Sequence, residues 1–210
     1  TKDREGLTPL KQKFAHEQEP QSTFLDAIGE VKPTAIVGCA AQAGSFNAYV
    51  LSAMARINER PIIFALSNPT SRSECTAREA YTYTEGKCLF ASGSPFPQVE
   101  VNGKTFIPRQ SNNSYVFPGI GLGLVVSSPR IVPQSVFLSA AEALSKIVSE
   151  DDLENGSLFP SLTKIREVSQ SIAAAVAEQC FTAGVAGVPK PDDLSKAIQE
   201  AMYKPVYDRI

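Results

Sequence analysis

Three asparagines beside apolar segments are the side chains of this sequence that are best suited to bind a small polar ligand. Asn68 follows the apolar run 61–66, and Asn112 and Asn113 precede the apolar run 115–117. A carboxamide is a donor and an acceptor at once, so it can bind a carboxylate or a nicotinamide amide without adding charge. Asparagine also caps helices well, and this local role competes for the same side chain.

Other kinds of site have little support in the composition. The 210 residues include one histidine, His16, and four cysteines without a C-x-x-C pair: Cys39, Cys75, Cys88 and Cys180. This removes most metal-site and catalytic-triad arrangements, and it favours reduced, mostly buried thiols in an intracellular protein. A net charge of −2 gives no reason to expect nucleic acid or an anionic membrane as a partner.

The elements expected to position the asparagines alternate along the first half of the chain. Short apolar runs predict strands at 33–38, 61–66 and 87–91. Capping signals and apolar residues at helical spacing predict helices that begin near Thr23, Phe46 and Thr76. This alternation is typical of right-handed βαβ units in a parallel sheet. The uniformly apolar run 61–66 is typical of a strand that is covered on both faces.

The ends of the predicted strands have a composition that suits a binding site. In an open parallel sheet, ligands bind beyond the carboxyl ends of the strands. Here those ends are Gly38–Gly44, Ser67–Pro69 and Ser92–Ser94, which are all small, polar or glycine-bearing. Such residues let backbone N–H groups approach a ligand closely. They also serve βα turns for steric reasons alone, so that alternative stays open.

Local signals predict where individual elements begin. Ser45 is expected to cap the helix 46–57, and both Ser71-x-x-Glu74 and Thr76-x-x-Glu79 match a capping box. Asn102-Gly103 between alternating residues predicts a hairpin at 99–106 that projects from the surface.

The second half is predicted to be mostly helical. Apolar residues share a helical face at 137–148, at 165–176, and at 194–202 after a start at Pro191-Asp192. We therefore expect an α/β fold: part of a Rossmann-like domain at 1–110, then a helical continuation and C-terminal segment at 111–210. Because the chain begins at Thr1 and runs directly into a charged segment, we expect it to be a piece of something longer.

The run G-I-G-L-G at 119–123 contains half of a dinucleotide-binding fingerprint. That fingerprint needs a preceding strand and an acidic residue about 20 positions further on. No good strand precedes these glycines, and no Asp or Glu occurs between Glu100 and Glu142. We predict that they pack closely against neighbouring helices instead of binding a pyrophosphate.

Several motifs together resemble the cofactor-binding C-terminal half of malic enzymes. The matching stretches are R-P-I-I-F-A-L-S-N-P-T at 60–70, E-C-T-A-R-E-A-Y-T-Y-T-E-G at 74–86, C-L-F-A-S-G-S-P-F at 88–96 and N-N-S-Y-V-F-P-G-I-G-L-G at 112–123. Agreement is weaker through F-A-H-E at 14–17 and S-L-F-P-S-L-T-K-I-R at 157–166. Malic enzymes oxidise (S)-malate with NAD(P) and a divalent metal, then decarboxylate it to pyruvate and CO₂. The resemblance therefore implies a fragment of a larger oxidoreductase.

The resemblance also implies roles for single residues. Asn68 is similar to the asparagine that contacts malate beside the nicotinamide. Asn112 and Asn113 resemble the pair that contacts the substrate and the nicotinamide ribose. Gly38 and the turn after it correspond to the segment beneath the cofactor, although the family commonly has a glycine-richer turn than Ala40–Gly44.

Coenzyme choice is expected to depend on Lys11, with Lys13 as the second candidate. NADP-preferring members carry a lysine shortly before F-A-H-E, and Lys11-Gln12-Lys13 stands there. A cation suits the 2′-phosphate of NADP, which carries nearly two negative charges. NAD remains possible, and the other reading of these lysines is a solvated loop.

The family's catalytic tyrosine and lysine and its ligands for Mg²⁺ or Mn²⁺ correspond to segments upstream of Thr1. We expect no catalytic or metal-binding residue here, and an inactive fragment on its own. Expected partners are malate or pyruvate and further copies in a dimer or tetramer, but neither nucleic acid nor a membrane. The cytoplasm is the expected compartment, with plastid and mitochondrion as alternatives. The competing hypothesis is a non-catalytic module that binds a nucleotide or an organic acid.

Overall fold

Four parallel strands form the central sheet. The computed structural model describes residues 1–205, and in it the strands lie in the order β1 (Ala35–Gly38), β2 (Ile62–Ala65), β3 (Leu89–Ser92) and β6 (Arg109–Gln110). All neighbouring pairs are parallel, and Ile36 lies beside Ile63, which lies beside Phe90. The three predicted strands are confirmed. Strand β6 was missed because two polar residues give no apolar pattern.

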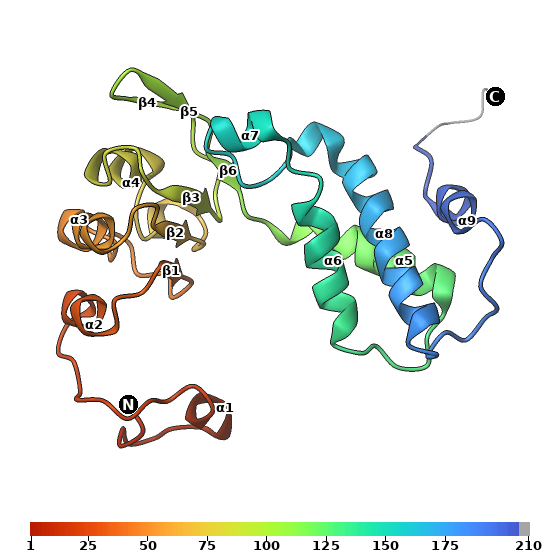
Figure 1. The fold of residues 1–210 in the computed structure, drawn as a ribbon, viewed down its shortest axis with the longest axis horizontal. Coiled ribbons are helices and arrows are strands. Elements are labelled where there is room, and N and C mark those ends of the chain that lie inside the picture. Colours follow the sequence, from red (N-terminus) through yellow and green to blue (C-terminus); the bar gives the residue numbers. More distant parts are fainter. Residues whose placement is uncertain (206–210) are drawn as a thin grey trace.

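Helices α2 (Phe24–Val31), α3 (Ala48–Ile57) and α4 (Ala77–Tyr83) cover one face of the sheet (Figure 1). Ile36, Ile63 and Phe90 point to this side and are buried in one core with residues of all three helices. The opposite face is open at β1, where Val37 is 57% exposed. In the run 61–66, for which cover on both faces is predicted, Ile63 and Ala65 are buried and Ile62 and Phe64 on the opposite face are half-buried, so within residues 1–205 the prediction is met only in part.

Two of the predicted helix starts need correction. Asn47, not Ser45, caps α3, because its Oδ1 accepts from the amides of Tyr49 and Val50. The capping box at Thr76 is confirmed, with Glu79 accepting from the Thr76 amide and hydroxyl. The box at Ser71 is wrong: 70–72 is a 3₁₀ turn, and the side chain of Glu74 turns into the interior.

The hairpin of β4 (Val99–Val101) and β5 (Lys104–Phe106) is confirmed. Asn102 and Gly103 both have positive φ, as a two-residue hairpin turn of this kind requires. The hairpin is not only a surface excursion, since Phe106 is buried and its ring stacks on Tyr81 with centroids 4.2 Å apart.

The second half is helical and lies beyond β6 (Figure 1). It contains α5 (Phe117–Ser127), α6 (Ser135–Ser145), α7 (Glu150–Glu154), α8 (Ile165–Thr182) and α9 (Leu194–Ala201), with 3₁₀ turns at 113–115 and 162–164. Helix α8 packs against α5 and α6. Two details differ from the prediction: Asp193 caps α9, and α6 buries Val136, Ala140 and Leu144 while Phe137 is 52% exposed.

Two of the three α5 glycines are packing residues, as predicted. A Cβ on Gly119 would lie 2.7 Å from Ile172, and one on Gly123 would lie 2.7 Å from the carbonyl oxygen of Ala173. Both glycines therefore face α8, whereas Gly121 faces open space. The close approach of α5 to α8 therefore uses one face of α5.

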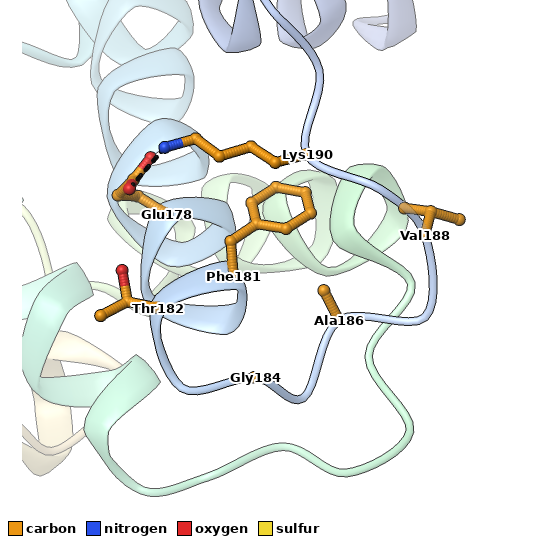
Figure 2. Close-up of a pocket in the computed structure, with 7 residues that line it drawn as sticks. All are labelled: Glu178, Phe181, Thr182, Gly184, Ala186, Val188 and Lys190. Atoms are coloured by element: carbon orange, nitrogen blue, oxygen red, sulfur yellow. Dashed lines mark hydrogen bonds and ion pairs between the residues drawn. The ribbon is translucent and has the colours of Figure 1, made fainter.

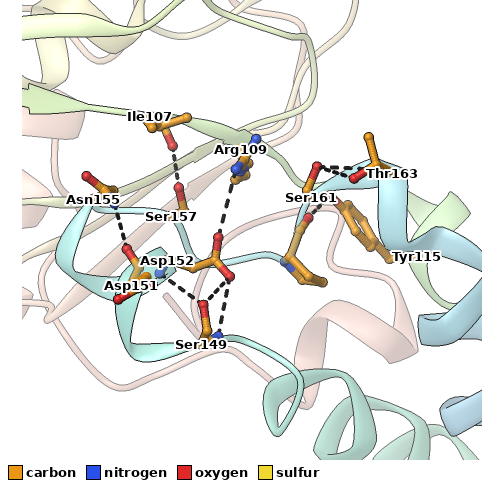
Figure 3. Close-up of polar contacts among 11 residues, drawn as sticks. Ile107, Arg109, Tyr115, Ser149, Asp151, Asp152, Asn155, Ser157, Ser161 and Thr163 are labelled. Carbon is orange, nitrogen blue, oxygen red and sulfur yellow. Dashed lines mark hydrogen bonds and ion pairs between the residues drawn. The ribbon is translucent and has the colours of Figure 1, made fainter.

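Polar contacts join the sheet to the helical half at β6 (Figure 3). Ser157 donates to the carbonyl of Ile107 at 2.6 Å, and Tyr115 donates to the carbonyl of Pro160 at 2.6 Å. The Arg109 guanidinium lies 3.8 Å from the Asp152 carboxylate. These contacts hold the segment that leads from β6 to Asn112.

Candidate functional site

The carboxyl ends of the four strands meet at one edge of the sheet, because all four strands are parallel. Asn68 lies just beyond β2, and Asn112 and Asn113 lie just beyond β6, with β3 between them. Adjacent strands are spaced by about 4.8 Å, so the ends of β2 and β6 are roughly 10 Å apart. The sheet thus brings these three predicted residues to the same edge.

The carboxamide of Asn68 is held in one orientation. Its Oδ1 accepts from the Ser94 hydroxyl at 2.7 Å, and its Nδ2 faces the carbonyl of Leu66 at 3.4 Å. Because a carbonyl only accepts, the nitrogen must be on that side. The side chain is exposed and does not cap the 3₁₀ turn that follows Pro69, so the capping alternative is wrong for Asn68.

Two residues at the end of β3 support Asn68, a contact that the sequence did not reveal. Ser94 binds its oxygen, and Gly93 leaves room for its nitrogen, since a Cβ there would lie 2.8 Å from Nδ2. The sequence did contain one signal for this contact: small residues follow both β2 and β3. Because these two strands are neighbours in a parallel sheet, the residues after them lie at the same edge.

Asn112 combines both of the roles considered for it. Its Oδ1 caps the 3₁₀ turn by accepting from the Ser114 amide at 2.9 Å, while the exposed side chain keeps its Nδ2 for another partner. The preceding residues are tied to β3, because the Ser111 amide donates to Ser92 and the Gln110 side chain donates to Gly93, both at 2.7 Å. Asn113 is also exposed.

Gly38 ends β1, and the turn after it reaches the end of β2. The Ala41 amide donates to the Ser67 hydroxyl at 2.9 Å. Gly38 has a packing reason to be glycine, since a Cβ would lie 2.8 Å from Oε1 of the buried Glu74. Its place at the sheet edge also suits the cofactor contact that the family resemblance implies.

Lys11 and Lys13 lie away from the asparagines. Lys11 is in the short helix α1 (Pro9–Gln12), which stands apart from the sheet in Figure 1, and Lys13 follows it. Both are exposed, and Lys11 lines a hollow of about 350 Å³ with Arg4 and Phe14. Within residues 1–205, no hydrogen bond or ion pair joins either ammonium group to the strand ends.

The titratable groups of the sheet core do not serve the edge. Burial raises the pKa of Cys88 to about 12 and also raises the pKa values of Cys75 and Tyr81, so these groups stay protonated near neutral pH. Cys75, Cys88 and Cys180 are buried free thiols, whereas Cys39 is exposed. The strand ends therefore expose amides, hydroxyls, backbone groups and the Cys39 thiol, and the Glu74 carboxylate lies buried beside them.

Among residues 1–205 no group of three or more His, Cys, Asp or Glu side chains is placed to hold a metal, and no helix there is long and apolar enough to cross a membrane. A pocket of about 480 Å³ lies at the end of α8, where Lys190 pairs with Glu178 at 2.7 Å (Figure 2). It contains none of the strand ends.

A parallel sheet with helices beside it and polar turns at its carboxyl edge defines a nucleotide-binding domain of the Rossmann type. The comparisons with known proteins identify the family. A family model described as the malic enzyme NAD-binding domain matches residues 1–181, and the chain belongs to the malic enzyme family. The resemblance noted in the sequence is confirmed.

Individual relatives agree with this assignment. The chloroplastic NADP-dependent malic enzyme of Zea mays is 50% identical over 96% of this chain, and the mitochondrial NAD-dependent enzyme of Ascaris suum is 45% identical over 100%. A crystal structure of malic enzyme from Pyrococcus horikoshii matches 80% of the chain with a TM-score of 0.60 and 25% identity. The chain spans about a third of these proteins: 32%, 33% and 34% of their lengths.

Proposed function

We propose that this chain is the cofactor- and malate-binding part of an NADP-preferring malic enzyme, which oxidises (S)-malate and decarboxylates the product to pyruvate and CO₂. The observation that carries the proposal is the pair of carboxamides, Asn68 and Asn112, at the carboxyl edge of a sheet that belongs to this family. A neutral amide binds a carboxylate by hydrogen bonds alone, so it orients malate without becoming its counter-ion.

Each asparagine has a distinct part in this proposal. The Nδ2 of Asn68 donates to malate, while Ser94 and Leu66 keep the amide from rotating. Asn112 and Asn113 contact the substrate and the nicotinamide ribose, and the turn after Gly38 lies beneath the cofactor. When bound, the nicotinamide accepts the hydride that malate gives up.

Proton transfer and metal binding belong to other parts of the whole enzyme. Beside the strand ends the Glu74 carboxylate is buried against Ser67, and no cluster among residues 1–205 is placed to hold Mg²⁺ or Mn²⁺. The chain therefore positions the reactants, and on its own it is inactive.

Lys11, and after it Lys13, selects NADP through the ribose 2′-phosphate. An exposed ammonium group beside Arg4 in one hollow supports this role, since two cations attract a doubly charged phosphate. The NAD-dependent relative from Ascaris suum keeps NAD as the alternative coenzyme.

Assembly and compartment are also part of the proposal. Exposed Phe137 and Leu138 on α6 suit contact with a second copy in a dimer or tetramer, which light scattering of the full-length protein would measure. Free thiols suit a reducing compartment, for which we propose the cytoplasm. The chloroplastic and mitochondrial relatives supply the alternatives, and imaging of the tagged full-length protein would distinguish them.

The direct test uses the full-length protein and follows NADP⁺ reduction together with pyruvate. The expected result is malate-dependent formation of NADPH and pyruvate in equal amounts. Binding of NADP⁺ or malate without turnover would instead support the non-catalytic binding module, and turnover would exclude it.

A further inference from the structure

Glu74 is a carboxylate buried at the site edge without a cationic partner. It is 1% exposed, and no Lys, Arg or His within residues 1–205 forms an ion pair with it. Its two oxygens instead accept from one residue: Oε2 from the Ser67 amide at 3.3 Å, and Oε1 from the Ser67 hydroxyl. An apolar side chain would fill this space with less desolvation, so packing alone does not explain a carboxylate here.

The Ser67 hydroxyl links Glu74 to the turn after β1 through a second hydrogen bond. A hydroxyl has one hydrogen, and here it points to Glu74, which leaves the oxygen lone pairs free to accept. The Ala41 amide uses them at 2.9 Å. Ala41 has φ of +54°, a conformation that costs energy for a residue with a side chain and needs such support.

The far end of the same turn is also bound beside Glu74. The amide of Gly44 donates to the carbonyl of Ser73 at 3.2 Å, and that of Phe46 donates to the carbonyl of Glu74 at 3.0 Å. Gly38 at the start of the turn leaves the space that the Glu74 side chain occupies. The end of β1 and the end of β2 therefore meet at the Glu74 side chain, and the far end of the turn is bound by the backbone carbonyls of Ser73 and Glu74.

We propose that Glu74 is a positioning residue that holds the 39–46 turn and the Ser67–Asn68 backbone as one unit. The turn is the segment assigned to the cofactor, and Asn68 is the residue assigned to malate, so Glu74 fixes the distance between the two ligands. This role in positioning the two ligands rests on the proposed function. The hydrogen-bond chain from Ala41 through Ser67 to Glu74 can be measured whether or not the protein binds malate.

The first test is amide hydrogen exchange on the full-length protein carrying Glu74→Gln. Glutamine keeps the shape but replaces one acceptor by a donor, so Ser67 cannot donate through both its amide and its hydroxyl. The expected result is exchange about 10-fold faster in a peptide covering 39–46, since the Ala41 amide loses its oriented acceptor. Unchanged exchange there would overturn the inference.

The matched control is Glu79→Gln. Glu79 accepts from the amide and the hydroxyl of Thr76, the same pair of donors, but at the exposed start of α4. The Glu79→Gln variant is expected to exchange its amide hydrogens faster only near 76–79. If Glu74→Gln does not fold, Ser67→Ala removes the hydroxyl alone and is expected to release the 39–46 turn equally; a fully protected turn in that variant contradicts the proposal.

The second test asks whether Glu74 acts through Asn68. Glu74→Gln is expected to lower kcat/KM for malate by about 10-fold in the wild-type background and less than about 3-fold in an Asn68→Ala background, because coupled residues are not additive. Equal losses in both backgrounds would overturn positioning through Asn68. If the full-length protein shows no malate turnover, the proposed function fails, and the exchange result alone decides whether Glu74 holds the turn.

Discussion

At the scale of the residue, the two ends of the Asn68 carboxamide have different tasks. Its Oδ1 is engaged by Ser94 at 2.7 Å, so it is the Nδ2 end that is available to a ligand. We therefore expect Asn68→Ala in the full-length enzyme to lower kcat/KM for malate by about 10- to 100-fold, the loss of one or two hydrogen bonds to the substrate. Asn68→Asp should lose more, because it sets a negative charge against the malate carboxylate.

Steady-state kinetics with malate as the varied substrate measures this effect. The control is Asn58→Ala, since the Asn58 amide donates to the carbonyl of Pro33 at 2.9 Å, just before β1 and so at the opposite end of the strands. A kcat/KM for Asn68→Ala equal to that of the wild type would remove Asn68 from the site.

The predicted preference for NADP over NAD depends on Lys11. Its exposed ammonium group makes no ion pair within residues 1–205, so its removal should leave the fold intact. Lys11→Ala is expected to raise KM for NADP by about 10-fold and to leave KM for NAD nearly unchanged, the loss of one charge-assisted contact to the 2′-phosphate. Kinetics with both coenzymes gives the comparison. Equal losses with NADP and NAD would contradict the assignment, and a selective loss in Lys13→Ala instead would move it to Lys13.

At the scale of the element, the sequence predicted structures that depend on residues close together in the chain, but it did not predict those that depend on contacts with other elements. Three apolar strands and the Thr76 capping box followed directly from the sequence. Strand β6 did not, because Arg109 and Gln110 form a strand only where β3 offers an edge. The role of Glu74 was also hidden: its spacing from Ser71 suggested a local cap, whereas its partner is Ser67, just after β2.

The glycines of α5 give a prediction at this scale. Gly123 faces the α8 backbone, where a Cβ would lie 2.7 Å from the carbonyl of Ala173, while Gly121 faces open space. Gly123→Ala should destabilise the protein by about 1–3 kcal/mol, since two helices must separate. Gly121→Ala should stabilise it by up to about 1 kcal/mol through helix propensity. Denaturant midpoints of the two variants test this, and similar shifts for both would show that α5 does not approach α8 through one face.

At the scale of the whole molecule, the sheet is covered on one face and open on the other at β1. Val37 is 57% exposed, and its neighbours in register, Phe64 and Ala91, are half-buried and buried. The apolar composition of β1 and β2 suits a strand pair with cover on both sides. The relatives are about three times as long as this chain, which leaves ample polypeptide in such a protein to supply that cover.

Val37→Asp tests whether the full-length protein covers this face. If it does, the substitution buries a charge and should lower the free energy of unfolding by about 2–4 kcal/mol. The control is Val125→Asp, because Val125 is 72% exposed on α5, outside the sheet, and should tolerate the charge. Denaturation of both full-length variants measures the difference. A Val37→Asp protein as stable as the wild type would mean that the open face of β1 is solvent-exposed in the complete enzyme, and that the apolar character of Val37 needs another explanation.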